Sequence, residues 1–207
     1  MKKIPTVFKK MFDGDRYLGV IDKFTNKECE NAFLYGNATV KMDGAAVAVI
    51  NGKLYMRYDA KLNKNGIPKT VPEGAIPCCE RDPFTGHMPC WLITDKNNPN
   101  CKWHIAAYEN YYKEQGAVSD GTYEAIGIHF QNNPYKLTTD TLYRHGSAVL
   151  ENVPRTYDGI AQWLKEYYTE GIVFWYNNEP VCKIRRIDFR YSWNNGQDLS
   201  GLKQINY

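Results

Sequence analysis

The sequence has 207 residues, of which 43% are hydrophobic, 14% aromatic and 24% charged. This composition excludes an intrinsically disordered chain and a long coiled coil. A chain of this length can fold as one domain that buries roughly 70% of the surface its unfolded form exposes. We therefore expect a single domain over residues 1–207. The net charge of +3 is too small to indicate a nucleic-acid partner, so such a partner has to be argued from local sites.

The hydrophobic runs of the chain are short. None approaches the roughly 20 residues that a membrane-spanning helix needs, and residues 1–10 contain lysines and a proline that interrupt any signal-peptide core. We expect a cytoplasmic protein with no membrane association and no obligate protein partner. Six cysteines are too few for a disulfide scaffold, and a reducing compartment would keep them as thiols.

The first clear element is a β-hairpin over residues 45–59. Asn51 and Gly52 separate two strand-like runs, and both residues tolerate the positive φ angles of a type I′ turn. A two-residue turn determines the register of the two strands. The pairs that this register predicts are Ile50–Lys53, Ala48–Tyr55 and Ala46–Arg57.

Residues 63–99 are dense in Gly, Pro, Asn and Cys without a sustained period, which predicts a loop-rich insertion. With His87 and His104 nearby, four cysteines of this region offer enough ligands for tetrahedral zinc: Cys78, Cys79, Cys90 and Cys101. Their spacing contains no Cys-x2-Cys pair, however. We therefore interpret them as free thiols and keep zinc as the alternative.

Two helices and a second hairpin are predicted in the rest of the chain. One helix runs over residues 105–115 and ends at Gly116, and the other follows Thr156 as its N-cap. Strands at 171–176 and 181–187 form the hairpin. Even-numbered residues of its first strand are expected opposite odd-numbered residues of its second. If the first strand extends back to Glu170, that residue shares a face with Lys183 and Arg185. These elements predict an α+β fold of antiparallel β-sheets with flanking helices.

Charged residues recur inside or beside the apolar strands. Lys41 stands just before the first hairpin, where Gly44 permits close approach of a phosphate or nucleotide. Taken alone, a surface lysine beside a turn is the simpler interpretation of this short pattern. The other charged positions on strand-like segments are Arg57, Glu124, Glu170, Lys183 and Arg185. Because buried charges are costly unless they face one another or a ligand, the set predicts a shared polar cleft.

In this order, the motifs resemble those of the covalent nucleotidyltransferases, which include ATP-dependent DNA and RNA ligases and messenger-RNA capping enzymes. Residues 41–44 resemble the nucleophile motif, and Arg57 resembles the basic residue of the next strand. Glu124 and Glu170 resemble the two acidic motifs, and residues 183–185 the final basic motif. Further segments resemble the small RNA ligases related to the vertebrate enzyme that joins 5′-phosphate to 3′-hydroxyl ends: 57–61 (RYDAK), 82–87 (DPFTGH), 121–124 (GTYE), 133–134 (NP), 145–146 (HG) and 170–173 (EGIV).

The resemblance implies a reaction and a set of roles. Lys41 would attack the α-phosphate of ATP to form a lysyl-adenylate, with Lys183 and Arg57 as further catalytic cations. The implied nucleotide contacts are Thr39, Val40, Asp43, Gly44, Glu124 and Arg185. Glu170 and Glu124 would hold Mg²⁺, or Mn²⁺ in its place. Because only a neutral amine attacks, nearby cations that disfavour the ammonium fit this chemistry.

Two departures from the superfamily pattern shape the prediction. Many members carry an arginine two residues beyond the motif glycine, where this chain has Ala46, and we expect Arg57 to supply that cation from the neighbouring strand. About 20 residues follow Arg186, too few for an appended OB-fold domain, so we expect a catalytic domain alone.

The expected substrate is RNA with 5′-phosphate and 3′-hydroxyl ends. Arg186, Arg190 and His145 are the candidate RNA contacts, and exposed lysines such as Lys9 and Lys10 could add to them. The resemblance leaves three alternatives open, which are a DNA nick ligase, an RNA capping guanylyltransferase and a catalytically inert RNA-binding module on the same fold.

Overall fold

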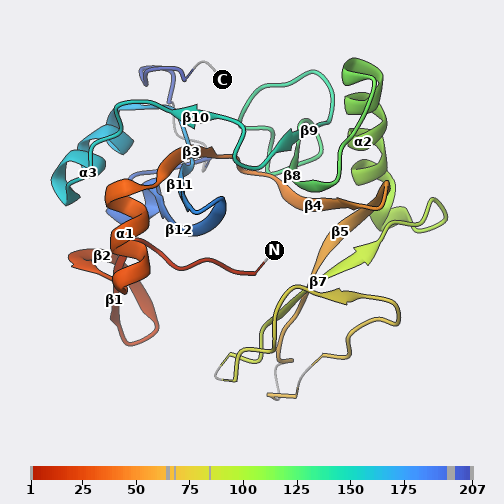
Figure 1. The fold of residues 1–207 in the computed structure, drawn as a ribbon, viewed down its shortest axis with the longest axis horizontal. Helices are drawn as coiled ribbons and strands as arrows, with labels where there is room; N and C mark the ends of the chain where they lie inside the picture. The colour runs from red at the N-terminus through yellow and green to blue at the C-terminus, as the bar shows by residue number, and fades with distance from the viewer. Residues whose placement is uncertain (1, 64–65, 68, 84, 195–198, 206–207) are drawn as a thin grey trace. The chain divides into compact units, whose positions relative to one another are not determined.

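The computed structural model describes residues 2–63, 66–67, 69–83, 85–194 and 199–205. Residues 64, 65 and 68 of the predicted insertion, and residue 84 of the 82–87 motif, lie outside the described residues. The fold is α+β, with antiparallel sheets and a few helices, as predicted (Figure 1). Contacts divide the chain into two compact units, so the single-domain assignment stays a prediction. Unit 1 comprises Met1–Lys3 and Asp43–Arg144, and unit 2 comprises Ile4–Met42 and His145–Tyr207.

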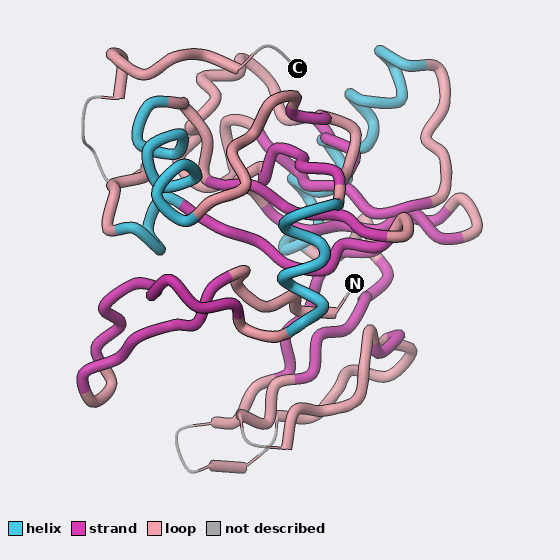
Figure 2. Tube along the Cα trace, turned by 60° about the vertical axis from the view of Figure 1, so that its left-hand side comes forward, coloured by secondary structure: helices cyan, strands magenta, loops and turns pink. Residues whose placement is uncertain are grey.

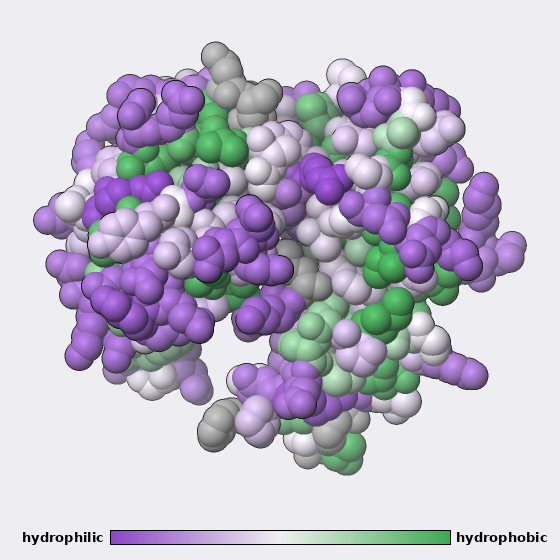
Figure 3. All heavy atoms as spheres, viewed as in Figure 1, coloured by the Kyte–Doolittle hydropathy of each residue, from purple (hydrophilic) through white to green (hydrophobic). Residues whose placement is uncertain are grey.

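Unit 2 is built on a four-stranded antiparallel sheet. Its strands in spatial order are β10 (Val149–Leu150), β3 (Asn37–Lys41), β11 (Gly171–Tyr176) and β12 (Glu179–Arg185). A separate hairpin of β1 (Phe8–Asp13) and β2 (Arg16–Phe24) forms a long two-stranded ribbon (Figure 2). The side chains of β1 beyond Phe8 are exposed, and hydrophilic residues dominate this part of the surface (Figure 3).

Two helices pack on this sheet, and a polar side chain caps each of them. In α1 (Lys27–Tyr35), the Asn26 side chain accepts a hydrogen bond from the Cys29 N–H. In α3 (Tyr157–Glu166), Thr156 accepts from the Gly159 N–H, which confirms the predicted N-cap. Helix α1 was not predicted, although the sequence signals its start. Asn26 is a favourable N-cap residue, and the glutamates that follow it suit a helix N-terminus.

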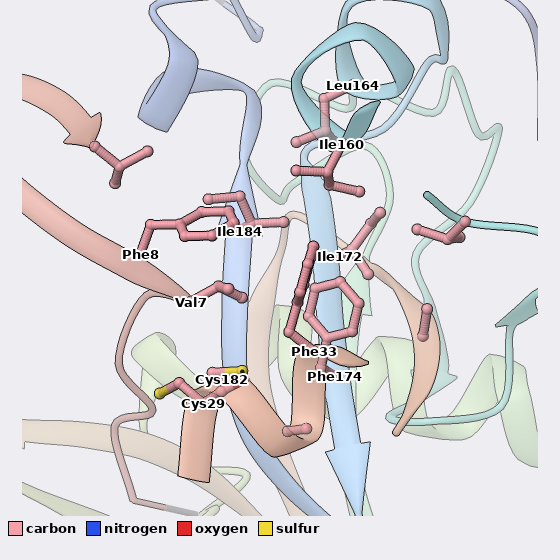
Figure 4. Packing of buried hydrophobic residues seen from close by; sticks show 14 residues of the cluster. Val7, Phe8, Cys29, Phe33, Ile160, Leu164, Ile172, Phe174, Cys182 and Ile184 are labelled. Carbon is pink, nitrogen blue, oxygen red and sulfur yellow. Dashed lines mark hydrogen bonds between the residues drawn. The ribbon is translucent and has the colours of Figure 1, made fainter. Parts of the chain in front are cut away.

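The core of unit 2 lies between the two helices and one face of the sheet. Ile172 and Phe174 of β11 and Ile184 of β12 are fully buried on this face (Figure 4). They pack with Phe33 of α1 and Leu164 of α3 (Figure 4). Since side chains alternate along a strand, the odd-numbered residues of β11 and β12 lie on the opposite face.

The predicted pairing of the second hairpin is confirmed only beside its turn. Asn177 and Asn178 both have positive φ, and Tyr176 pairs with Glu179. A register shift follows between Phe174 and Trp175, so that from there on even-numbered residues pair with even-numbered ones. The predicted parity is therefore wrong beyond the turn, because a β-bulge adds one residue to β12. Gly171, for example, pairs with Arg185.

Unit 1 holds a six-stranded antiparallel sheet with one long helix. Its strands in spatial order are β6 (Ile76–Pro77), β7 (Met88–Ile93), β5 (Lys53–Ala60), β4 (Ala45–Ile50), β8 (Gly121–Ile126) and β9 (Thr141–Arg144). The helix α2 (Lys102–Gln115) ends at Gly116 in the left-handed conformation, as predicted, and begins three residues earlier than expected. The predicted loop-rich stretch 63–99 also contains β6 and β7, and the short helix η1 (Pro99–Cys101) follows it.

The first predicted hairpin is confirmed in its turn and in most of its register. Asn51 and Gly52 both have positive φ, and the Ile50–Lys53 and Ala48–Tyr55 pairs are present. The ladder ends at Val47–Met56, one pair short of the predicted Ala46–Arg57 pair. Ala46 pairs instead with Glu124 of β8, and Arg57 pairs with Trp91 of β7. All six cysteines are free. No helix in the described part of the chain is long and apolar enough to cross a membrane.

Truncating Phe174 should destabilise the protein strongly, because its ring is fully buried and packs edge-on against Phe33 with centroids 5.1 Å apart. We expect Phe174→Ala to lower the free energy of unfolding by about 3–5 kcal/mol, measured by urea denaturation. Tyr176→Ala on the same strand removes a ring that is 37% exposed and should cost less than about 1 kcal/mol. Equal losses for both variants would contradict this assignment of the core.

Candidate active site

The face of the unit 2 sheet opposite its core carries a group of cations. Lys41 of β3 pairs with Gly171 of β11, which in turn pairs with Arg185 of β12. Residues paired across a sheet lie on the same face, so Lys41 and Arg185 flank a glycine that has no side chain between them. Lys183 lies one row along on the same face, opposite Val173. This face is the one turned away from the core.

Lys41 is held by an acidic residue of the same unit. Its ammonium donates a hydrogen bond to the Glu170 carboxylate and forms an ion pair with it. The two side chains are only 22% and 12% exposed. Glu170 precedes β11, and its backbone carbonyl accepts a hydrogen bond from the Arg186 N–H. The ion pair is thus anchored to the strands that carry the other cations.

Lys183 is the most perturbed cation of this face. Burial lowers its pKa to about 8, and the charges of Lys41 and Arg185 act in the same direction. Glu170 and Asp188 offset part of this effect. The backbone N–H of Lys183 donates to the Pro5 carbonyl and its carbonyl accepts from the Val7 N–H, so residues 5–7 cover the edge of β12. The low pKa indicates a place that disfavours positive charge unless an anion is present.

Arg185 is oriented by Asp188, a residue that was not among the predicted site residues. Asp188 is fully buried, and its carboxylate accepts hydrogen bonds from the backbone N–H and the guanidinium of Arg185. The Tyr17 hydroxyl also donates to Asp188, at 2.8 Å. Burial and this hydrogen bond raise the pKa of Tyr17. The spacing of Arg185 and Asp188 suggested no role, because the short helix η2 (Arg186–Phe189) that brings them together was not predicted.

The two other predicted residues of β3 lie on opposite faces. Thr39 shares the face of Lys41, and its hydroxyl accepts a hydrogen bond from the Trp175 indole N–H at 2.8 Å. The side chain of Val40 is buried with the core face, opposite Ile172, and its N–H donates to the Ala148 carbonyl. Strand alternation turns the Val40 side chain away from Lys41, and a nucleotide contact from Val40 stays a prediction.

The remaining motif residues belong to unit 1. Glu124 of β8 accepts a hydrogen bond from the Gly44 N–H at 3.2 Å, and the Asp43 N–H donates to the Tyr135 hydroxyl at 2.6 Å. A Cβ at Gly44 would lie 2.2 Å from the Ala125 carbonyl oxygen, so only glycine fits there. Gly44, the neighbour of Asp43 in the chain, thus contacts Glu124, and the nucleotide roles of these three residues stay predictions. Tyr135 was missed, since nothing in its sequence context indicated this contact.

Arg57 is positioned by two neighbours in unit 1. Its Nε donates to Asp59 Oδ1 at 2.8 Å, and its guanidinium lies over the Trp91 ring, 5.8 Å from the centroid. His87 Nε2 lies 3.3 Å from the same carboxylate oxygen. Burial would raise the pKa of Asp59, but the hydrogen bonds and charges of Arg57 and His87 outweigh it and lower that pKa.

The three predicted RNA contacts have different environments. Arg186 is buried, and its guanidinium donates to the carbonyls of Leu164, Tyr167 and Ser192. The Arg186 side chain therefore helps to hold the fold, and its RNA contact stays a prediction. Arg190 is exposed and adopts a left-handed backbone conformation, and His145 is half-buried at the start of the second segment of unit 2. The RNA roles of these last two residues stay predictions.

Glu170 is the predicted metal ligand of this sheet. Among the described residues, no three His, Cys, Asp or Glu side chains gather as a metal cluster, and this holds for the cysteines weighed as zinc ligands. Mg²⁺ is commonly bound by one or two carboxylates together with phosphate oxygens and waters. The Glu170 carboxylate, beside Lys41 on the sheet, fits that kind of site.

Comparison with known proteins supports a relationship to RNA ligases. No family model matches the chain. Among curated proteins, it is similar to RNA ligase 1 of Pongo abelii, with 23% identity over 235 aligned residues. The alignment covers 91% of this chain and 72% of that protein. The similarity is distant, yet it extends over nearly the whole chain.

The low pKa of Lys183 predicts a pH dependence of stability. Between pH 8 and 10.5 the unfolded chain binds more protons at this residue than the folded one, so the free energy of unfolding should rise with pH. Relative to Lys183→Met, the parent protein should gain on the order of 3 kcal/mol across this window. Denaturant titrations at several pH values measure the difference, with the exposed Lys9→Met as control. A difference that stays flat or falls with pH would refute the assignment.

Proposed function

We propose that this protein is an ATP-dependent RNA ligase that uses Lys41 as its nucleophile. The observation that carries the proposal is the Lys41–Glu170 ion pair, on a sheet face that also presents Lys183 and Arg185. Such a face suits a polyphosphate, because its cations neutralise phosphate oxygens while the ion pair keeps the amine in place. The distant similarity to RNA ligase 1 favours RNA over other acceptors.

In the first step, the Lys41 amine would form a bond to the α-phosphorus of ATP, and pyrophosphate would leave. Attack requires the neutral amine, so Nζ must first lose a proton to solvent. The ion pair with Glu170 stabilises the ammonium and must therefore open before attack. Lys183 and Arg185 would then face the phosphate oxygens, where negative charge develops. We propose Glu124, Arg57, Asp43 and Gly44 as further nucleotide contacts.

The next two steps would transfer the adenylate and seal the RNA. An oxygen of the RNA 5′-phosphate attacks the adenylate phosphorus, which breaks the bond to Lys41 and leaves a 5′-adenylylated RNA. A 3′-hydroxyl then attacks the RNA phosphorus, loses its proton and expels AMP. Glu170 would hold Mg²⁺, which when bound supplies positive charge to the phosphates. Asp188 would act throughout by holding Arg185 in place.

The nucleophile is tested by intact mass spectrometry after incubation with ATP and Mg²⁺. The parent protein should gain one adenylate, and Lys41→Met should gain none, because it lacks the attacking nitrogen. Lys27→Met is the matched control, since Lys27 also pairs with a glutamate of unit 2 but is 76% exposed. Equal modification of the parent and Lys41→Met would refute the nucleophile.

Two further arms separate the alternatives. GTP replaces ATP to test a capping-type guanylyltransferase, and nicked DNA replaces RNA as the acceptor. RNA with 5′-phosphate and 3′-hydroxyl ends should give a joined product on a denaturing gel. RNA binding without any covalent adenylate would identify an inert RNA-binding module and would refute the proposed activity.

Glu170→Gln tests the acidic partner. The amide keeps the shape of the side chain and a hydrogen-bond acceptor for Lys41 but removes the negative charge. We expect the rate of self-adenylation to fall by about 100-fold or more, as for other charged groups that act on the transition state. Glu166→Gln, which disturbs an exposed pair with Lys203, should keep the parent rate. A Glu170→Gln rate equal to that of the parent would exclude a catalytic role for this carboxylate.

A further inference from the structure

A basic pocket lies within unit 1, and Arg57 is the one site residue named by the resemblance that lines it among the described residues. Its volume is about 480 Å³, which is in the range of small-ligand pockets. The polar residues that line it are Lys3, Arg57, Asp59, Lys61, Thr85 and His87. Three cations against one carboxylate leave an excess of two positive charges, which predicts an anionic ligand.

Strand periodicity explains how β5 brings charges to this pocket. Arg57 and Asp59 are two residues apart and therefore lie on one face of β5, and Lys61 continues the same spacing just beyond its end. The β5–β7 ladder ends at the Ala60–Met88 pair. His87 immediately precedes β7, so Lys61 and His87 leave the same end of the ladder. Two neighbouring strands thus deliver polar side chains to one place.

A tight turn positions the residues before β7. The Asp82 carboxylate accepts a hydrogen bond from the Thr85 N–H at 2.7 Å, and the Asp82 carbonyl accepts from the Gly86 N–H at 2.8 Å. Gly86 has a φ of +61°, and a Cβ there would come within 2.2 Å of the Leu62 side chain. The turn therefore requires glycine, and it holds Thr85 and His87 in place.

Asp59 organises the pocket without neutralising it. Its Oδ1 contacts both Arg57 Nε and His87 Nε2, at 2.8 and 3.3 Å. The side chains of Arg57 and His87 are only 18% and 13% exposed, and the Arg57 guanidinium also lies over the Trp91 ring. Because these groups are already ordered, a ligand that binds them loses less free energy to side-chain ordering.

We propose that this pocket binds a terminal phosphate of the substrate. A phosphate monoester carries a charge of about −1.5 to −2 at pH 7, which matches the excess of two positive charges. Arginine and lysine are the usual phosphate partners, and the Thr85 hydroxyl adds a hydrogen-bond donor. The inference rests on the proposed function, which offers two sources, the 5′-phosphate of an RNA and the terminal phosphates of ATP.

The RNA source is tested by fluorescence anisotropy without ATP. The probes are two RNA oligonucleotides of one sequence, with a 5′-phosphate or a 5′-hydroxyl and a blocked 3′ end. We expect the parent to bind the 5′-phosphate RNA about tenfold more tightly than the 5′-hydroxyl RNA, which is the gain in affinity from one hydrogen bond to a charged group. Lys61→Met and His87→Gln should lose this preference. Lys53→Met is the matched control, since Lys53 is an exposed lysine on β5 outside the pocket and its loss should leave the preference intact.

The ATP source is tested by isothermal titration with ATP and AMP. If the pocket holds the terminal phosphates of ATP, Lys61→Met should weaken ATP binding about tenfold and leave AMP binding unchanged. Either result supports a phosphate site. The proposal is overturned if Lys61→Met and His87→Gln unfold thermally like the parent, keep the preference for the 5′-phosphate, and Lys61→Met binds ATP as tightly as the parent does. Both experiments measure equilibrium binding and do not require the Lys41 adenylate. Absence of that adenylate would therefore refute the proposed function and leave the phosphate site in place.

Discussion

The alternation of side chains in the sheet of unit 2 is the constraint on which the candidate active site depends. Burial of Ile172, Phe174 and Ile184 against the helices determines which face of β11 and β12 is the core. Once that face is chosen, Lys183 and Arg185 must lie on the other one, in the rows of Thr39 and Lys41. The hydrophobic core therefore places the cations, and a one-residue slip of a strand would reverse them.

Gathering cations on one face has an electrostatic cost that the fold offsets with two carboxylates. Glu170 binds Lys41, and the buried Asp188 binds Arg185. Lys183 is not fully compensated, which is why burial and its cationic neighbours lower its pKa to about 8. An incoming polyphosphate would supply the missing negative charge. The uncompensated positive charge therefore favours an anionic ligand at this face.

Unit 1 arranges its polar groups by a different device. Gly44, Asp43 and Glu124 are held by backbone N–H groups and a tyrosine hydroxyl, while one carboxylate, that of Asp59, orients Arg57 and His87. In both units a carboxylate orients a cation. The buried Asp188 orients Arg185 in unit 2, and Asp59 orients Arg57 in unit 1. Charged hydrogen bonds are short-ranged and directional, so they can define the position of a long side chain that packing alone leaves free.

Elements with strong local signals were predicted from the sequence alone. Two-residue turns with positive φ at Asn51-Gly52, the Thr156 cap and the Gly116 C-cap depend on neighbours in the chain, so composition and spacing reveal them. The same holds for the candidate residues Lys41, Glu170 and Lys183, whose charged side chains interrupt or border apolar strands.

The tertiary structure decided the features that depend on residues far apart in the sequence. The bulge in β12 reversed the expected pairing, the short helix η2 joined Arg185 to Asp188, and packing buried the side chains of Arg186 and Val40. Tyr17 meets Asp188 across 171 residues of chain. Sequence periodicity determines which residues lie on one face of a helix or strand. Packing determines which other elements contact that face, because burial and hydrogen bonding are satisfied by the whole fold.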